Sequence, residues 1–358
     1  MWFQASSGLL LLLLSPCLAV QFREPPAPTR QSTRTPVEGW IDVRLNHFMA
    51  SDTQTFKMRY YYNDEFAADN IVIVVGGEWQ ITPGYLTGGL AYELAEKSRA
   101  ALFYTEHRFY GLTRPFEDTS LPGLAYLTVD QALADLAQFI EYVKSDNFEN
   151  GRYRNAKVAL EGCSYAGSMV TWMRLAYPHL VDAAFSDSGP LYAQEDFPEY
   201  LEVITEAIRS QGSEECLTSI QQGMERVVEL LGTTNGANQV SQMFRTCSPI
   251  DASNALDVAT FFWYGITETF AYLVQYARPG QIAQACAALN NNTVSDPAQR
   301  LADWITSRPT TQPCVKSKYS DEVTNHRNTS FDSSDATSKS SFPSSRNVYR
   351  TKHFARIT

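Results

Sequence analysis

One short segment has the residue types of a serine nucleophile. Ser164 stands in the motif Gly-Cys-Ser-Tyr-Ala-Gly at 162–167, between an apolar strand candidate at 157–160 and an amphipathic helix candidate that stops before Pro178. A nucleophile elbow needs this context, because a tight strand-to-helix turn lifts the serine hydroxyl above the sheet. We predict Ser164 as the nucleophile and the backbone N–H of Tyr165 as one oxyanion donor. An ordinary Gly-Ser turn is the alternative.

A second glycine-rich segment follows a continuous β-branched run at 71–75. Gly76 and Gly77 allow a close backbone approach to a ligand, and the loop after an earlier strand supplies the second oxyanion donor in elbow-type sites. We therefore expect the Gly77 region to complete the oxyanion hole and Glu78 to contact the polar end of a substrate. On local sequence alone, a simple strand exit explains this segment nearly as well.

No histidine in the sequence has the position expected of a general base. His107 ends a strand candidate at 101–104, but in elbow-type sites the acid and the histidine follow the serine, so we expect His107 to hold its loop by hydrogen bonds. His179 ends the elbow helix, and His326 and His353 follow no strand candidate. No catalytic Asp or His is therefore identified after Ser164, and a serine without a base is a poor nucleophile.

Strand and helix candidates alternate over the first half of the chain. Strands are expected at 56–62, 71–75, 101–104, 157–160 and 183–185, and helices at 89–99 and 128–144. This alternation predicts an α/β fold with a mostly parallel sheet.

The chain divides into five segments by composition. Residues 1–19 read as a signal peptide with an apolar core too short to span a bilayer, and 20–37 as an extended lead-in. The α/β core is expected over 38–196 and a mainly helical cap over 197–315. Residues 316–358 form an atypical, Ser-rich tail that lacks acidic residues from Lys339 onward, and we predict it to be partly disordered.

Charge and cysteine content narrow the function classes. The net charge of −10 argues against a general nucleic-acid binder. Of the five cysteines after the signal peptide, Cys163 is expected to be an unpaired, buried, inert thiol. Four others could form two disulfides in three alternative pairings: Cys216, Cys247, Cys286 and Cys314. Sequons at Asn291 and Asn328 are candidate glycan sites.

Together, the segments at 76–78, 106–111 (Glu-His-Arg-Phe-Tyr-Gly), 162–167 and 176–179 (Ala-Tyr-Pro-His) resemble the prolyl carboxypeptidase and dipeptidyl peptidase II family of serine peptidases, nearest the thymus-specific serine protease branch. The resemblance covers roughly residues 40–336. It implies an α/β-hydrolase core with an inserted, disulfide-bearing helical cap, a glycoprotein that is secreted or lysosomal, and action on peptides. It also implies the pairs Cys216–Cys286 and Cys247–Cys314.

Two departures from the family follow. The resemblance implies further strands carrying the catalytic Asp and His, and because the likeness fades near 336–338 we expect those strands to be missing. Cys163 also replaces the glycine usual before the serine.

We predict a serine-type, exopeptidase-like peptidase with Ser164 forming the acyl-enzyme, and the family resemblance implies that cleavage can be directed at proline. A secreted, inactive remnant that lacks the triad Asp and His is the alternative, and a lipase or esterase is a third reading. We expect a peptide substrate, no metal or other cofactor, no nucleic-acid partner and no membrane span, and the sequence allows a homodimer.

Overall fold

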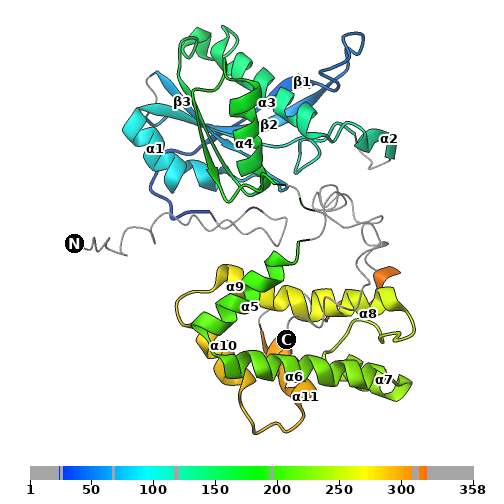
Figure 1. Cartoon of the computed structure of the whole chain (residues 1–358). Coiled ribbons are helices and arrows are strands. Elements are labelled where there is room, and N and C mark those ends of the chain that lie inside the picture. The colour runs from blue at the N-terminus through cyan, green and yellow to red at the C-terminus, as the bar shows by residue number, and fades with distance from the viewer. Residues whose placement is uncertain are drawn as a thin grey trace, which may run out of the picture. The chain divides into compact units, whose positions relative to one another are not determined.

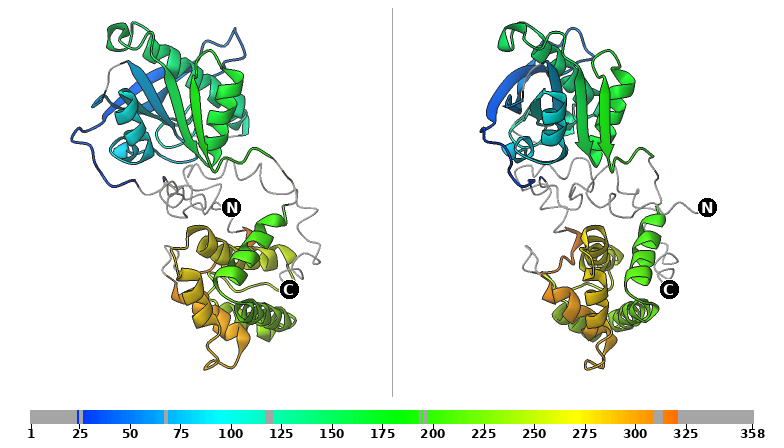
Figure 2. Two further views of the ribbon diagram at one scale, coloured as in Figure 1. Left: turned by 60° about the vertical axis from the view of Figure 1, so that its left-hand side comes forward. Right: turned by 90° about the vertical axis from the view of Figure 1, so that its left-hand side faces the viewer.

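The computed structural model describes Glu24 and residues 27–66, 69–116, 121–192, 194, 197–308 and 314–320. These residues fall into two compact units, the first running to residue 193 and the second beginning at Gln194. Figures 1 and 2 show a unit built on a sheet and a unit built of helices.

The first unit contains a six-stranded sheet in the order β1-β2-β4-β3-β5-β6. The strands are β1 Val37–Arg44, β2 Thr55–Asn63, β3 Asn70–Val75, β4 Ala100–Thr105, β5 Val158–Cys163 and β6 Ala183–Asp187. The pairings β4–β3, β3–β5 and β5–β6 are parallel, whereas β1–β2 and β2–β4 are antiparallel. The sheet is thus mixed, with its parallel half around β3 and β5, the two strands that precede the predicted site segments.

Helices cover both faces of the sheet. They are η1 Pro83–Leu86, α1 Leu90–Ser98, α2 Leu121–Leu124, α3 Val129–Lys144, η2 Glu149–Gly151 and α4 Tyr165–Ala176. Residues of α3 and α4 pack with Ile71, Ile73 and Phe103, and residues of α1 pack with Val72 and Leu102 on the opposite face. This two-sided cover explains why the parallel strands read as continuous apolar runs.

Strand β1 lies where an extended lead-in was expected to end, and the sequence did not predict it. Only alternate residues face the core, Ile41 and Val43, while Val37 is exposed. The strand is stabilised by pairing with β2 along its whole length, from Val37 opposite Tyr62 to Arg44 opposite Thr55. This pairing compensates for a hydrophobic pattern too weak to predict a strand from the sequence.

The second unit is helical. Its helices are α5 Glu199–Gln211, α6 Glu214–Leu231, α7 Thr234–Met243, α8 Ala255–Phe261, a π-helical turn η3 Phe262–Thr267, α9 Glu268–Tyr276, α10 Gln281–Leu289 and α11 Pro297–Ser307. They share one apolar core that includes Val227, Phe244 and Phe261.

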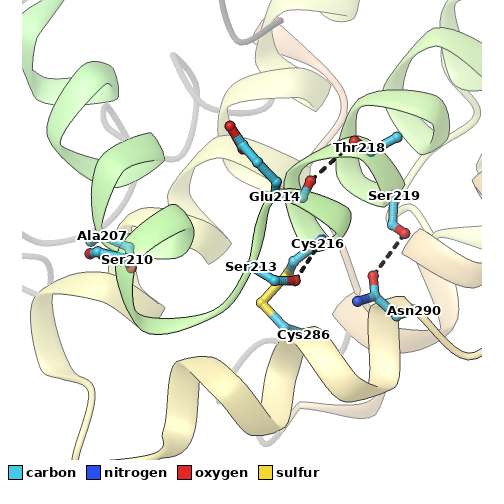
Figure 3. Close-up of a disulfide and its surroundings, with 9 residues drawn as sticks. All are labelled: Ala207, Ser210, Ser213, Glu214, Cys216, Thr218, Ser219, Cys286 and Asn290. Carbon is cyan, nitrogen blue, oxygen red and sulfur yellow. Dashed lines mark hydrogen bonds between the residues drawn. A yellow bond between two sulfur atoms is a disulfide. The ribbon is translucent and has the colours of Figure 1, made fainter.

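Two disulfides tie these helices together. Cys216 on α6 bonds to Cys286 on α10, and Figure 3 shows the Ser213 hydroxyl accepting from the Cys216 backbone N–H beside this bond. Cys247 bonds to Cys314, next to the backbone bridge between Thr246 and Val315. Both pairs are those that the family resemblance implies.

Strand β6 ends the described part of the sheet and is paired there with β5 alone. Residues 183–186 are exposed, including Phe185 with 44% of its surface accessible. None of the helices in the described ranges is long and apolar enough to cross a membrane.

Candidate active site

Ser164 occupies the turn between β5 and α4 in a strained conformation. Its φ of 56° and ψ of −128° lie outside the regions that a side-chain-bearing residue normally adopts. The backbone holds it there, because the Ser164 N–H donates to the Asp187 carbonyl at 3.0 Å and the Ser168 N–H donates to the Ser164 carbonyl at 3.1 Å. The strain and the position at the carboxyl end of β5 are those of a nucleophile elbow.

The small residues around Ser164 are required by close backbone contacts. A Cβ on Gly162 would lie 2.3 Å from the Ala166 carbonyl oxygen, and one on Gly167 would lie 2.7 Å from the Asp187 carbonyl oxygen. Ala166 is itself fully buried. The spacing of small residues in the motif therefore has a steric origin, and an ordinary Gly-Ser turn would not need it.

The predicted oxyanion donors lie on α4 and after β3. Tyr165 is the first residue of α4, where backbone N–H groups have no partner within the helix and can receive a developing negative charge. The Gly76 N–H is used by the Thr105 carbonyl at 2.9 Å, so it is not the second donor. Gly77 is buried against Trp79, and its N–H stays the predicted second donor.

Glu78 is the predicted substrate contact and has unusual electrostatics. Burial raises its pKa to about 7. Burial, and then the charge of Glu78, raises the pKa of Tyr165, so the carboxyl acts electrostatically on the residue that follows Ser164. A carboxyl that changes charge near neutral pH can bind either a cationic or a hydrogen-bonding group.

His107 is fixed away from the role of catalytic base. It is buried, its Nδ1 lies 2.7 Å from the Arg108 carbonyl oxygen, and its Nε2 lies 3.1 Å from the Tyr165 hydroxyl. Burial lowers its pKa to about 4. With both ring nitrogens engaged, His107 holds its loop by hydrogen bonds, which is the role expected from the sequence.

The structure adds two acidic residues that the sequence did not indicate. Glu161 lies on β5 and Asp187 ends β6. Burial, and then the charge of Asp187, raises the pKa of Glu161 to about 7. In the described part of the chain, Glu161 Oε2 is the one buried side-chain oxygen or nitrogen without a hydrogen-bond partner. In the sequence, the one sign of this site was that Glu161 stands inside an otherwise apolar strand.

A buried ionic cluster behind the site was also missed. Asp135 on α3 accepts from Arg108 Nε at 2.6 Å and Nη2 at 2.7 Å, and lies 2.7 Å from His47 Nε2. Arg108 is completely buried and also donates to the carbonyls of Leu45 and Tyr126. This cluster anchors the loop that contains His107.

Cys163 is disulfide-bonded, so the prediction of an unpaired thiol is wrong. Its side chain is also only partly buried, at the end of β5. It is therefore no candidate nucleophile.

The other predicted residues lie away from Ser164 or outside the description. His179 is exposed beyond the far end of α4, a helix of 12 residues. Asn291 is exposed after α10, as glycan attachment requires. Asn328, His326 and His353 lie outside the described residues, as does the predicted signal peptide. Over the ranges that the structure covers, no three His, Cys, Asp or Glu side chains gather as a metal site.

Comparison with known proteins places these features in a family. The model of the serine carboxypeptidase S28 family matches residues 43–347, past the point near 336 where the resemblance was expected to fade. Thymus-specific serine protease from Mus musculus is 32% identical over 308 residues, covering 82% of this chain and 60% of that protein. Lysosomal Pro-X carboxypeptidase from Homo sapiens is 29% identical over 273 residues, covering 72% of this chain and 54% of that protein.

The matches cover only part of the relatives, and the structural similarity is low. The chain spans about half the length of the curated relatives it matches. Among solved structures, the acylaminoacyl peptidase of Pyrococcus horikoshii is 19% identical over 44% of this chain and 24% of that chain, with a TM-score of 0.31. A score that low supports no argument, so the fold assignment depends on the strand order and the family match. With its α/β-hydrolase sheet and its serine elbow, the chain belongs to the serine carboxypeptidase S28 family.

Proposed function

We propose that this chain is a serine-type exopeptidase that cleaves peptides at proline through an acyl-enzyme on Ser164. The strained φ of Ser164 at the junction of β5 and α4 carries this proposal, because such strain is retained where function requires it. Membership of a serine peptidase family supplies the reaction class.

The site residues have distinct roles in the proposed reaction. Ser164 Oγ attacks the scissile carbonyl, and the oxyanion that forms is stabilised by the N–H groups of Tyr165 and Gly77. Glu78 contacts the polar end of the substrate. We assign the general base to a residue other than His107, whose ring nitrogens are both engaged.

Preference for proline is supported by a relative. The human protein that covers 72% of this chain is named lysosomal Pro-X carboxypeptidase, and we propose the same bond preference here. By the same likeness we propose a secreted or lysosomal glycoprotein, with a signal peptide at 1–19 and a glycan on the exposed Asn291.

Peptide cleavage by the purified full chain tests this proposal. The substrates are Ala-Ala-Pro-Phe and Ala-Ala-Ala-Phe, each with a free and with an amidated carboxyl end, and mass spectrometry detects the product. We expect release of phenylalanine from the free-acid proline peptide alone, and loss of that release in Ser164→Ala. Ser188→Ala is the matched control, because Ser188 is exposed and its hydroxyl donates to its neighbour Asp187. Equal cleavage of all four peptides, or undiminished release by Ser164→Ala, would refute the proposal.

A peptide-binding protein without catalysis is the second candidate. The described histidines favour it, because His47 contacts Asp135, both ring nitrogens of His107 are engaged, and His179 is exposed beyond the far end of α4. Binding of the proline peptide by both wild type and Ser164→Ala, with no release of phenylalanine from either, would support this candidate over the peptidase.

A further inference from the structure

The protonation of His107 follows from its contacts. A backbone carbonyl can only accept a hydrogen bond, so the 2.7 Å contact with the Arg108 carbonyl oxygen places the ring proton on Nδ1. His107 is only 5% exposed, and burial lowers its pKa to about 4, so the ring is neutral at physiological pH. A neutral ring with its proton on Nδ1 has a bare Nε2 that can only accept.

The partner of Nε2 is therefore the donor. The Tyr165 hydroxyl, 3.1 Å away, must give its single proton to His107 Nε2. Toward any other molecule, the phenolic oxygen then offers only lone pairs.

The surroundings keep this arrangement rigid. The rings of His107 and Tyr165 lie 5.5 Å apart in an edge contact, and Tyr110 packs against the imidazole at 5.1 Å. The next residue, Arg108, is held by the buried carboxylate of Asp135. The orientation of the hydroxyl is thus set before any ligand binds.

Tyr165 is adjacent to the proposed nucleophile and is only partly buried. We propose that its hydroxyl is a specificity-determining acceptor for one backbone amide N–H of the bound peptide, with His107 as the positioning residue that uses the phenolic proton. This inference depends on the proposed function, because it assumes that a peptide lies over Ser164.

One consequence concerns proline. Because proline has no amide N–H, the peptide residue that faces Tyr165 is not proline, and the preferred proline stands at another position. The hydroxyl would therefore help to set the register of the peptide on the nucleophile.

The first test reads the tautomer directly. The full chain is labelled with ¹⁵N-histidine, and two-bond ¹H–¹⁵N correlations report which ring nitrogen has the proton. We expect the Nδ1–H form in one histidine whose signals change in Tyr165→Phe. An Nε2–H form for that histidine would overturn the inference, whatever the chain does to peptides.

The second test measures binding in the Ser164→Ala full chain by calorimetry. The probes are Ala-Ala-Pro-Phe and analogues with one amide N-methylated at a time. Adding Tyr165→Phe should weaken binding roughly three- to tenfold, the usual range for one neutral hydrogen bond, and should remove the penalty at one N-methylated position. Tyr177→Phe is the matched control, because it removes a phenol from the opposite end of α4.

The outcomes separate this inference from the proposed function. Binding of the peptide with equal affinity in Tyr165→Phe would overturn the inference and leave the peptidase proposal standing. Failure of the Ser164→Ala chain to bind any of the probes would overturn both.

Discussion

Glu161→Gln tests how much the ionised Glu161 carboxylate, which precedes the elbow on β5, lowers the free energy of unfolding. Burial and the nearby Asp187 raise the pKa of Glu161 from 4.5 to about 7. A raised carboxyl pKa means that the folded protein holds the proton more tightly than the unfolded chain. The associated stability is fully present below about pH 4.5 and is lost as the pH rises through about 7.

The size of the effect follows from the two pKa values. Each unit corresponds to about 1.4 kcal/mol, so the shift corresponds to about 3 kcal/mol, and partial contact with solvent reduces this to about 2 kcal/mol. The glutamine of the variant cannot ionise, although its buried amide imposes a cost of its own at every pH. The informative quantity is therefore the change in the free energy of unfolding between pH 5 and pH 8, and not its absolute value.

Urea unfolding of wild type and Glu161→Gln at both pH values gives this quantity. We expect the wild type to lose about 2 kcal/mol more than the variant between pH 5 and pH 8. Glu65→Gln is the control, because hydrogen bonds from Ser32 and Thr33 outweigh its desolvation and lower the pKa of Glu65 to about 2, below this window. Identical pH dependence in wild type and Glu161→Gln would refute the reasoning.

Three other predictions concern the frame of the site and the helical unit. Gly162→Ala should lower the thermal midpoint of unfolding and should reduce the reactivity of Ser164 severalfold. The reason is that the new Cβ would lie 2.3 Å from the backbone oxygen of Ala166 in the elbow. Asp135→Asn should lower the free energy of unfolding by about 3–5 kcal/mol in urea titrations, since it leaves the charge of Arg108 buried without its partner. Replacing both Cys216 and Cys286 by serine should lower the free energy of unfolding by about 4 kcal/mol, because that disulfide closes a loop with a sequence separation of 70.

Each of these has a control and a contrary result. Gly232→Ala places its Cβ 3.1 Å from the nearest atom and should be mild, so equal effects of the two glycine variants would contradict the steric reasoning. Asp42→Asn breaks an exposed pair with Lys57 and should cost less than about 1 kcal/mol, and a similar cost for Asp135→Asn would contradict the role of burial. An unchanged unfolding curve after loss of the disulfide would contradict the loop-closure reasoning.

Features specified by local pattern could be predicted from the sequence. The apolar runs of β3 and β5, the amphipathic helix α3 and the elbow motif all depend on neighbours along the chain. The loop role of His107 was also predicted, from the chain order of the catalytic residues.

Features specified by distant contacts could not be predicted. A mainly helical cap was expected over 197–315, but the sequence did not indicate the π-helical turn that the structure places at Phe262–Thr267. A Cβ on Gly265 in this turn would lie 2.8 Å from Val315, a neighbour that helical periodicity cannot reveal. The hydrogen bond from Tyr165 to His107 joins residues separated by 58 positions and was hidden in the same way.

Fluorophosphonate labelling of the full chain tests the central claim, that Ser164 is an activated nucleophile. Intact mass would count the adducts, and peptide mapping would locate them. We predict one adduct on Ser164 that is lost in Ser164→Ala and retained in Ser188→Ala. A folded wild-type chain that gains no adduct, or gains it on another residue, would contradict the claim.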